Sequence, residues 1–168
     1  MKVAVLALPR TGSAWLATVT GMWHDPLTVT NGESVDRMLE RGEGIVDTGA
    51  GLAAITAKDK YESMGYQVHV LVREPSEAYG SLIRKGWDPS FELARSIDVA
   101  YDDLYALGVP VHHYPNGIYE LATDLAEHRA AMWRQLLDTN IQRDPSIYWN
   151  TDLKTKYQEW INAPILRK

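Results

Sequence analysis

The stretch KVAVLALPRTGSAWL, residues 2–16, decides the fold. It opens with an apolar run over residues 2–8, and such a continuous run predicts a strand buried on both faces of a sheet. Residues 9–12 then form a turn that contains a glycine, and from Ser13 apolar side chains recur at helical spacing until about Gly21. A buried strand, a short turn and a helix are together typical of the first unit of a parallel α/β sheet.

The same alternation of strand and helix continues along the chain. Its further predicted elements are strands at 44–48, 66–72 and 109–114, and helices at 30–41, 52–64, 75–84, 88–107 and 118–137. Because parallel strands are joined by helices that cover both faces of the sheet, we predict an α/β three-layer sandwich with a central parallel sheet of about four strands. Residues 144–168 are predicted to form a loop and a short helix on the core of a single domain, 1–168.

Charge and cysteine content exclude several classes of protein. The 168 residues carry 17 Lys and Arg against 22 Asp and Glu, a net charge of −5, which argues against a duplex nucleic-acid partner but leaves room for a local basic pocket. The absence of cysteine removes disulfides, thiolate metal sites and a Cys nucleophile. No apolar run approaches the length of a membrane span, and the N-terminus lacks the pattern of a signal peptide. We therefore expect a cytoplasmic protein with no membrane partner.

The turn at residues 9–14, Pro-Arg-Thr-Gly-Ser-Ala, has the features of an anion site. At a helix N-terminus the unpaired N–H groups and the helix dipole both favour a bound anion. The turn contains no Lys and no GxxxxGK motif, which argues against the phosphate loop of ATP- and GTP-hydrolysing enzymes. The alternative interpretation is a structural turn in which Thr11 caps the helix.

LPRTGSAWL, residues 8–16, resembles the loop that binds the 5′-phosphosulfate in sulfotransferases dependent on 3′-phosphoadenosine-5′-phosphosulfate. The matching positions are Arg10, Thr11, Gly12, Ser13, Trp15 and Leu16. Ala14 departs from the pattern, since the family usually has a second hydroxyl there. The resemblance implies a P-loop NTPase-like fold in which residues 10–14, including Ala14, cradle the 5′-phosphosulfate.

A second motif follows the strand predicted at 66–72. In VREPSEAYGSLIR, residues 72–84, Ser81 stands eight positions after Arg73, so an arginine at a strand end and a serine two turns into the next helix can converge on one phosphate. This stretch resembles the family's motif for the 3′-phosphate, with Glu74 in place of the common Asp or Asn. The resemblance covers residues 1–85 and implies that Arg73 and Ser81 bind the 3′-phosphate.

Sulfuryl transfer also needs a group that removes the acceptor's proton. By resemblance to the members that use a glutamate, that group is Glu33, which follows Asn31 and Gly32; Glu33 could also be the second member of a capping box with Thr30. Two alternative bases are His24, predicted at the end of the first helix, and Asp47, predicted at the end of the second strand. The adjacent histidines His112 and His113 fit no metal-ligand spacing and are interpreted as structural.

These motifs lead to one expected function and two alternatives. We expect an enzyme that moves a sulfuryl group from 3′-phosphoadenosine-5′-phosphosulfate to a hydroxyl or amine of a small-molecule acceptor, with no metal. Arg10 is expected to act in catalysis as well as in donor binding. Because the chain is short for the family, the acceptor pocket is expected to be open or completed by a second subunit of a homo-oligomer. The alternatives are a nucleotide or nucleoside kinase and a non-catalytic nucleotide-binding homologue.

Overall fold

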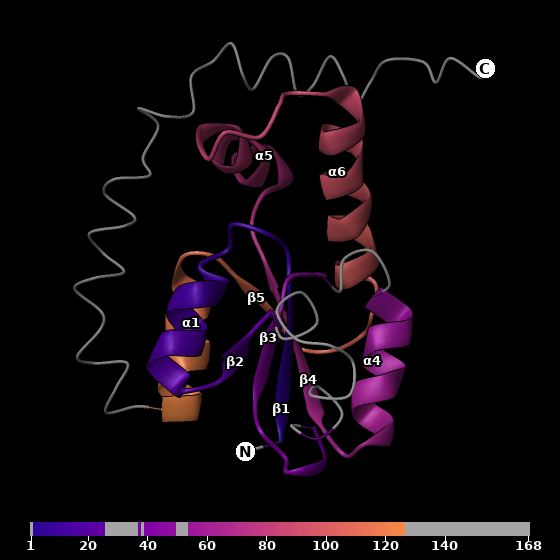
Figure 1. Cartoon of the computed structure of the whole chain (residues 1–168), viewed down its shortest axis with the longest axis vertical. Coiled ribbons are helices and arrows are strands. Elements are labelled where there is room, and N and C mark those ends of the chain that lie inside the picture. The colour runs from indigo at the N-terminus through magenta and orange to yellow at the C-terminus, as the bar shows by residue number, and fades with distance from the viewer. Residues whose placement is uncertain (1, 26–36, 38, 50–53, 127–168) are drawn as a thin grey trace.

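The computed structural model describes residues 2–25, 37, 39–49 and 54–126 (Figure 1). Its elements, in chain order, are β1 (Val3–Ala7), α1 (Ser13–Thr20), β2 (Trp23–His24), β3 (Ile45–Asp47), α4 (Ala54–Ser63), β4 (Gln67–Val72), α5 (Pro75–Arg84), α6 (Phe91–Tyr105) and β5 (Val111–His113). Residues 116–126 are also helical. The predicted base Glu33 and the predicted C-terminal loop and helix at 144–168 lie outside the described residues.

The strands form one sheet in the order β2-β3-β1-β4-β5, and every pair of neighbours is parallel. The central strand β1 is flanked by β3 and β4, so the loops that follow these three strands lie at the same edge of the sheet. This arrangement confirms the predicted α/β fold with a parallel sheet. Ligands of open α/β sheets bind at this edge, beyond the carboxyl ends of the strands.

The described sheet has five strands where the sequence predicted about four. The additional strand is β2, which follows the left-handed C-cap Gly21 of α1 almost directly and pairs with β3. Two backbone hydrogen bonds hold it: the Trp23 N–H donates to the Gly44 carbonyl at 2.8 Å and the Asp25 N–H to the Val46 carbonyl at 2.8 Å. The sequence predicts the end of a helix here and no strand, because two residues are too few to show a strand pattern.

Buried side chains cover both faces of the sheet. Successive residues of β1 point to opposite faces: Val3, Val5 and Ala7 pack with α1 and residues 116–126, whereas Ala4 and Leu6 pack with α4 and α6. Figure 1 shows α1 beside the orange helix of residues 116–126 on one side of the sheet and α4 on the other. All five residues of β1 are buried, which explains the unbroken apolar run in the sequence. Within the described residues, no helix is long and apolar enough to cross a bilayer.

Candidate functional site

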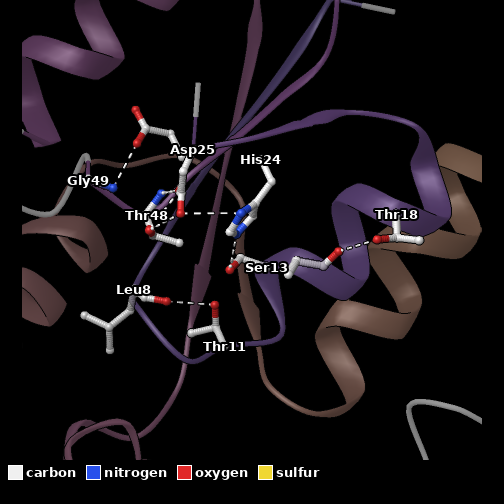
Figure 2. Close-up of polar contacts among 10 residues, drawn as sticks. Leu8, Thr11, Ser13, Thr18, His24, Asp25, Thr48 and Gly49 are labelled. Atoms are coloured by element: carbon white, nitrogen blue, oxygen red, sulfur yellow. Dashed lines mark hydrogen bonds and ion pairs between the residues drawn. The ribbon is translucent and has the colours of Figure 1, made fainter. Parts of the chain in front are cut away.

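The loop between β1 and α1 leaves the first turn of α1 without a side-chain cap. The N-cap residue is Gly12, with a left-handed φ of 80°, and it has no side chain to bond the helix N–H groups. A Cβ at this position would lie 2.8 Å from Cδ1 of Ile118, so the close packing also favours glycine. The interpretation of Thr11 as N-cap is wrong: Thr11 is fully buried and its hydroxyl donates to the Leu8 carbonyl at 2.8 Å (Figure 2).

The loops after β1 and β4 meet through the side chains that the sequence singled out. Nε of Arg10 donates to Oγ of Ser81 at 3.0 Å, and Nη1 of Arg73 donates to the Arg10 carbonyl at 3.2 Å. Arg10 itself is exposed and has a left-handed φ of 69°, an uncommon conformation for a residue other than glycine. Two arginines and a serine hydroxyl, from segments more than sixty residues apart, thus lie at one edge of the sheet.

Arg73 is almost completely buried, with 6% of its surface exposed. Its Nε donates to Oε2 of Glu77 at 3.0 Å, and its guanidinium lies 4.5 Å from the centre of the Tyr114 ring. The partner carboxylate of Glu77 is half exposed. A buried guanidinium that is stacked on a ring and paired with a solvent-exposed carboxylate keeps its charge and its orientation, which are the properties needed to bind a phosphate.

The residue that departs from the family's second motif has a structural role. Glu74 is the N-cap of α5, where its carboxylate accepts a hydrogen bond from the Glu77 N–H at 3.0 Å and also from the Ser76 hydroxyl. Pro75 occupies the first helical position, where its missing N–H has no consequence. A glutamate can therefore replace Asp or Asn here without loss of the helix start that carries Ser81.

Ser13 and His24 form a contact that sequence spacing did not reveal. Oγ of the buried Ser13 lies 3.0 Å from Nε2 of His24, and Nδ1 of His24 lies 3.5 Å from Oδ2 of Asp25 (Figure 2). Asp25 in turn accepts hydrogen bonds from the Thr48 N–H at 2.7 Å and from the Thr48 hydroxyl at 2.9 Å. The prediction that His24 ends the first helix is wrong, since β2 places it beside the N-terminus of α1.

Ala14 is exposed in the first turn of α1. At this position the chain offers a ligand its backbone N–H, without the additional hydroxyl that the family usually has there. The turn at residues 9–14 therefore presents the side chains of Arg10 and Ser13 together with the uncapped first turn of α1.

Asp47, one of the alternative bases, is fully buried, and both of its carboxylate oxygens accept hydrogen bonds. Oδ1 accepts from the Gly49 N–H at 2.8 Å, and Oδ2 accepts from the Tyr61 hydroxyl at 3.2 Å. Burial and, after it, the charge of Asp47 raise the pKa of Tyr61 above its ordinary value, so this hydroxyl stays a donor at neutral pH. Asp47 thus holds the end of β3 against α4 through hydrogen bonds to both of its carboxylate oxygens.

Removal of the Tyr61 hydroxyl should therefore destabilise the fold. We expect Tyr61→Phe to lower the free energy of unfolding by about 1.5–3 kcal/mol, the usual contribution of a hydrogen bond to a charged group. Urea unfolding of the variant measures this change. Tyr105→Phe is the matched control, because Tyr105 is half exposed and its substitution should change stability by no more than about 0.5 kcal/mol. Equal stability of the two variants would contradict the role given to Asp47.

His112 pairs with His69, which is 43 positions earlier in the chain. Nδ1 of His69 lies 3.0 Å from Nε2 of His112 across β4 and β5. Burial lowers the pKa of both rings, and the neighbouring His112 lowers that of His69 further. Within the described residues no group of three or more His, Asp or Glu side chains is placed to hold a metal ion. The pair of His69 and His112 thus links two strands as neutral rings.

A cavity of about 310 Å³ opens where β5 ends and residues 116–126 begin. It is lined by Val111, His112, His113, Tyr114, Asn116 and Glu120, among others. Tyr114 is shared between this cavity and the buried Arg73, because its ring also covers that guanidinium. The cavity is therefore next to the Tyr114 ring that covers the Arg73 guanidinium.

No protein-family profile, curated protein or solved structure matches this chain.

Proposed function

We propose that this protein transfers a sulfuryl group from 3′-phosphoadenosine-5′-phosphosulfate to a hydroxyl or amine of a small-molecule acceptor. The observation that carries the proposal is the meeting of Arg10, Ser81 and Arg73 beside the uncapped N-terminus of α1. Arg10 and the N-terminus of α1 suit the 5′-phosphosulfate, and Arg73 and Ser81 suit the 3′-phosphate. A donor with two separate anionic groups would engage both at once.

In the proposed reaction an oxygen or nitrogen of the acceptor attacks the sulfur atom. The bond between sulfur and the bridging 5′-phosphate oxygen breaks, and adenosine 3′,5′-bisphosphate leaves with that oxygen. The acceptor's proton goes to a base, for which Glu33 is the proposed residue. Arg10 and the N–H groups of α1 would stabilise the negative charge that grows on the leaving oxygen, since fixed donors favour the transition state over the ground state.

A second candidate function, binding without transfer, is favoured by Ala14. This exposed residue stands where a hydroxyl would otherwise contact the phosphosulfate. In that case the protein would bind adenosine 3′,5′-bisphosphate and release no sulfated product with any phenol, alcohol or amine offered. The kinase alternative has no lysine in the loop to support it, and it would instead be revealed by magnesium-dependent turnover of ATP.

Discrimination between two nucleotides tests the proposed donor site. The wild-type protein should bind adenosine 3′,5′-bisphosphate about tenfold to a hundredfold more tightly than adenosine 5′-monophosphate, because a charge-assisted hydrogen bond contributes about 1.5–3 kcal/mol. Arg73→Ala should abolish the difference, and calorimetry measures both affinities. Arg95→Ala is the matched control, since Arg95 is exposed on α6. Equal affinity of the wild-type protein for the two nucleotides would exclude the assignment.

Arg73→Lys separates charge from geometry in the same assay. Lysine retains the positive charge but lacks the planar fork that binds a phosphate through two hydrogen bonds. We expect its discrimination to lie between those of the wild-type protein and Arg73→Ala. Thermal unfolding of both variants shows whether loss of the contact with the Arg10 carbonyl has changed the fold itself.

A further inference from the structure

The polar chain from Ser13 through His24 to Asp25 extends from the proposed donor site to β3 (Figure 2). Ser13 is at the first position of α1, and its hydroxyl has a single proton to donate. Thr48 fixes Asp25 by donating from both its N–H and its hydroxyl. Asp25 also has a left-handed φ of 46°, which is uncommon for a residue other than glycine. The strand β2 thus holds an imidazole against a hydroxyl of the anion loop.

The protonation state of His24 determines where the Ser13 proton points. In the neutral ring the proton belongs on Nδ1, which faces the Asp25 carboxylate, and Nε2 is then an acceptor. Ser13 must in that state donate to Nε2 and can offer a ligand only oxygen lone pairs, which repel an anion. When His24 carries two protons, Nε2 donates to Ser13, and the Ser13 hydroxyl proton becomes available to a bound anion.

Few other charged groups are near this ring in the described part of the chain. The helix α1 contains no charged residue, and the strand partner of His24 is the apolar Val46. Asp47 is engaged with Gly49 and with Tyr61 of α4, across the sheet from α1. Glu43 bonds the Trp23 indole and the Arg41 guanidinium. Asp25, whose Oδ2 lies 3.5 Å from Nδ1 of His24, is therefore the carboxylate beside this ring.

We propose that His24 is a positioning residue that directs the Ser13 proton, so that binding of the anionic donor takes up a proton at His24. This inference rests on the proposed function, because it needs a phosphate or phosphosulfate beside Ser13. Proton uptake and anion binding are reciprocal: each must favour the other by the same factor. The affinity for the anion should therefore increase as pH falls through the range in which histidines become charged, about pH 8 to 5.

Calorimetry with adenosine 3′,5′-bisphosphate tests this coupling. Titrations at one pH in two buffers of different ionisation enthalpy give the number of protons taken up per nucleotide. We expect a net uptake in the wild-type protein, up to about one proton, that is lost in His24→Gln and in Ser13→Ala. Thr18→Ala is the matched control: Thr18 is exposed on α1 and donates to the Ala14 carbonyl at 2.8 Å, and its substitution should leave the proton count unchanged.

The nucleotide's own phosphates also titrate near neutral pH, but they do so equally in every variant, so the difference between proteins is the quantity that decides. Between about pH 7.5 and pH 6 the wild-type affinity should increase by about threefold to tenfold more than that of Ser13→Ala. If His24→Gln does not fold, Ser13→Ala makes the same test, since it removes the hydroxyl and leaves the ring in place.

The outcomes separate this inference from the proposed function. If the wild-type protein and Ser13→Ala take up equal numbers of protons per nucleotide, the role of His24 is overturned and the proposed donor site is unaffected. A wild-type protein that does not bind the bisphosphate at all would overturn both. Loss of uptake in His24→Gln and Ser13→Ala, with normal uptake in Thr18→Ala, would establish the coupling.

Discussion

Arg10→Ala should retain most of its affinity for adenosine 3′,5′-bisphosphate while its turnover falls by about 10²–10³-fold, the usual effect of removing one donor that stabilises transition-state charge. In the proposed site the product nucleotide would still be held by Arg73 and by the helix N-terminus, whereas the exposed Arg10 is the proposed partner of the leaving oxygen. Release of the bisphosphate with the best acceptor from a screen of phenols, alcohols and amines measures turnover, and calorimetry measures affinity.

The contact between Arg10 and Ser81 gives this prediction a control of its own. Ser81→Ala removes the hydroxyl to which Nε of Arg10 donates but leaves the guanidinium present. We expect Ser81→Ala to weaken nucleotide binding and to reduce turnover less than Arg10→Ala does. Full turnover of Arg10→Ala would show that the leaving oxygen is stabilised elsewhere.

Glu33→Gln should reduce turnover by about 10²–10⁴-fold, the contribution expected of a positioned base. Glutamine has nearly the same size and can still serve in a capping box with Thr30, so stability should change by less than the roughly 1 kcal/mol of a lost cap. Nucleotide affinity should be unchanged. Steady-state turnover, urea unfolding and calorimetry measure the three quantities.

The alternative bases give distinct outcomes in the same experiment. A fully active Glu33→Gln together with an inactive His24→Gln would assign the acceptor's proton to His24. Asp47→Asn should act on stability, because both oxygens of this buried carboxylate already accept hydrogen bonds. A stable but inactive Asp47→Asn would contradict this interpretation.

Sequence patterns predicted the elements that are long or bounded by clear signals. The continuous apolar runs of β1 and β4 identify buried strands, and the glycine turn before Ser13 and the Pro75 start of α5 identify the helices that follow them. Because ligands of such sheets bind at the carboxyl ends of the strands, Arg10 and Arg73 were both expected at that edge, although no contact between them was predicted. The structure brings them within hydrogen-bond distance.

The features that the sequence did not predict depend on tertiary contacts. The strand β2 has only two residues and is formed by its pairing with β3, so no local periodicity in the sequence indicates it. The contact of Ser13 with His24 depends on that strand and was missed for the same reason. The hydrogen bond of Tyr61 to Asp47 likewise needs α4 to pack against the end of β3, which no spacing rule gives.

The close approach of Gly12 to Ile118 has a consequence for the order of events during synthesis of the chain. The turn at residues 9–14 is synthesised well before its packing partner Ile118, which is more than a hundred residues downstream of Gly12. The strand β1, which precedes this turn, is central in the sheet and pairs with β4. Before β4 and the later helices are synthesised, β1 therefore lacks one neighbouring strand and part of the packing on both of its faces. The turn at residues 9–14 therefore acquires its final packing only after the segment at 116–126 has been synthesised and has docked.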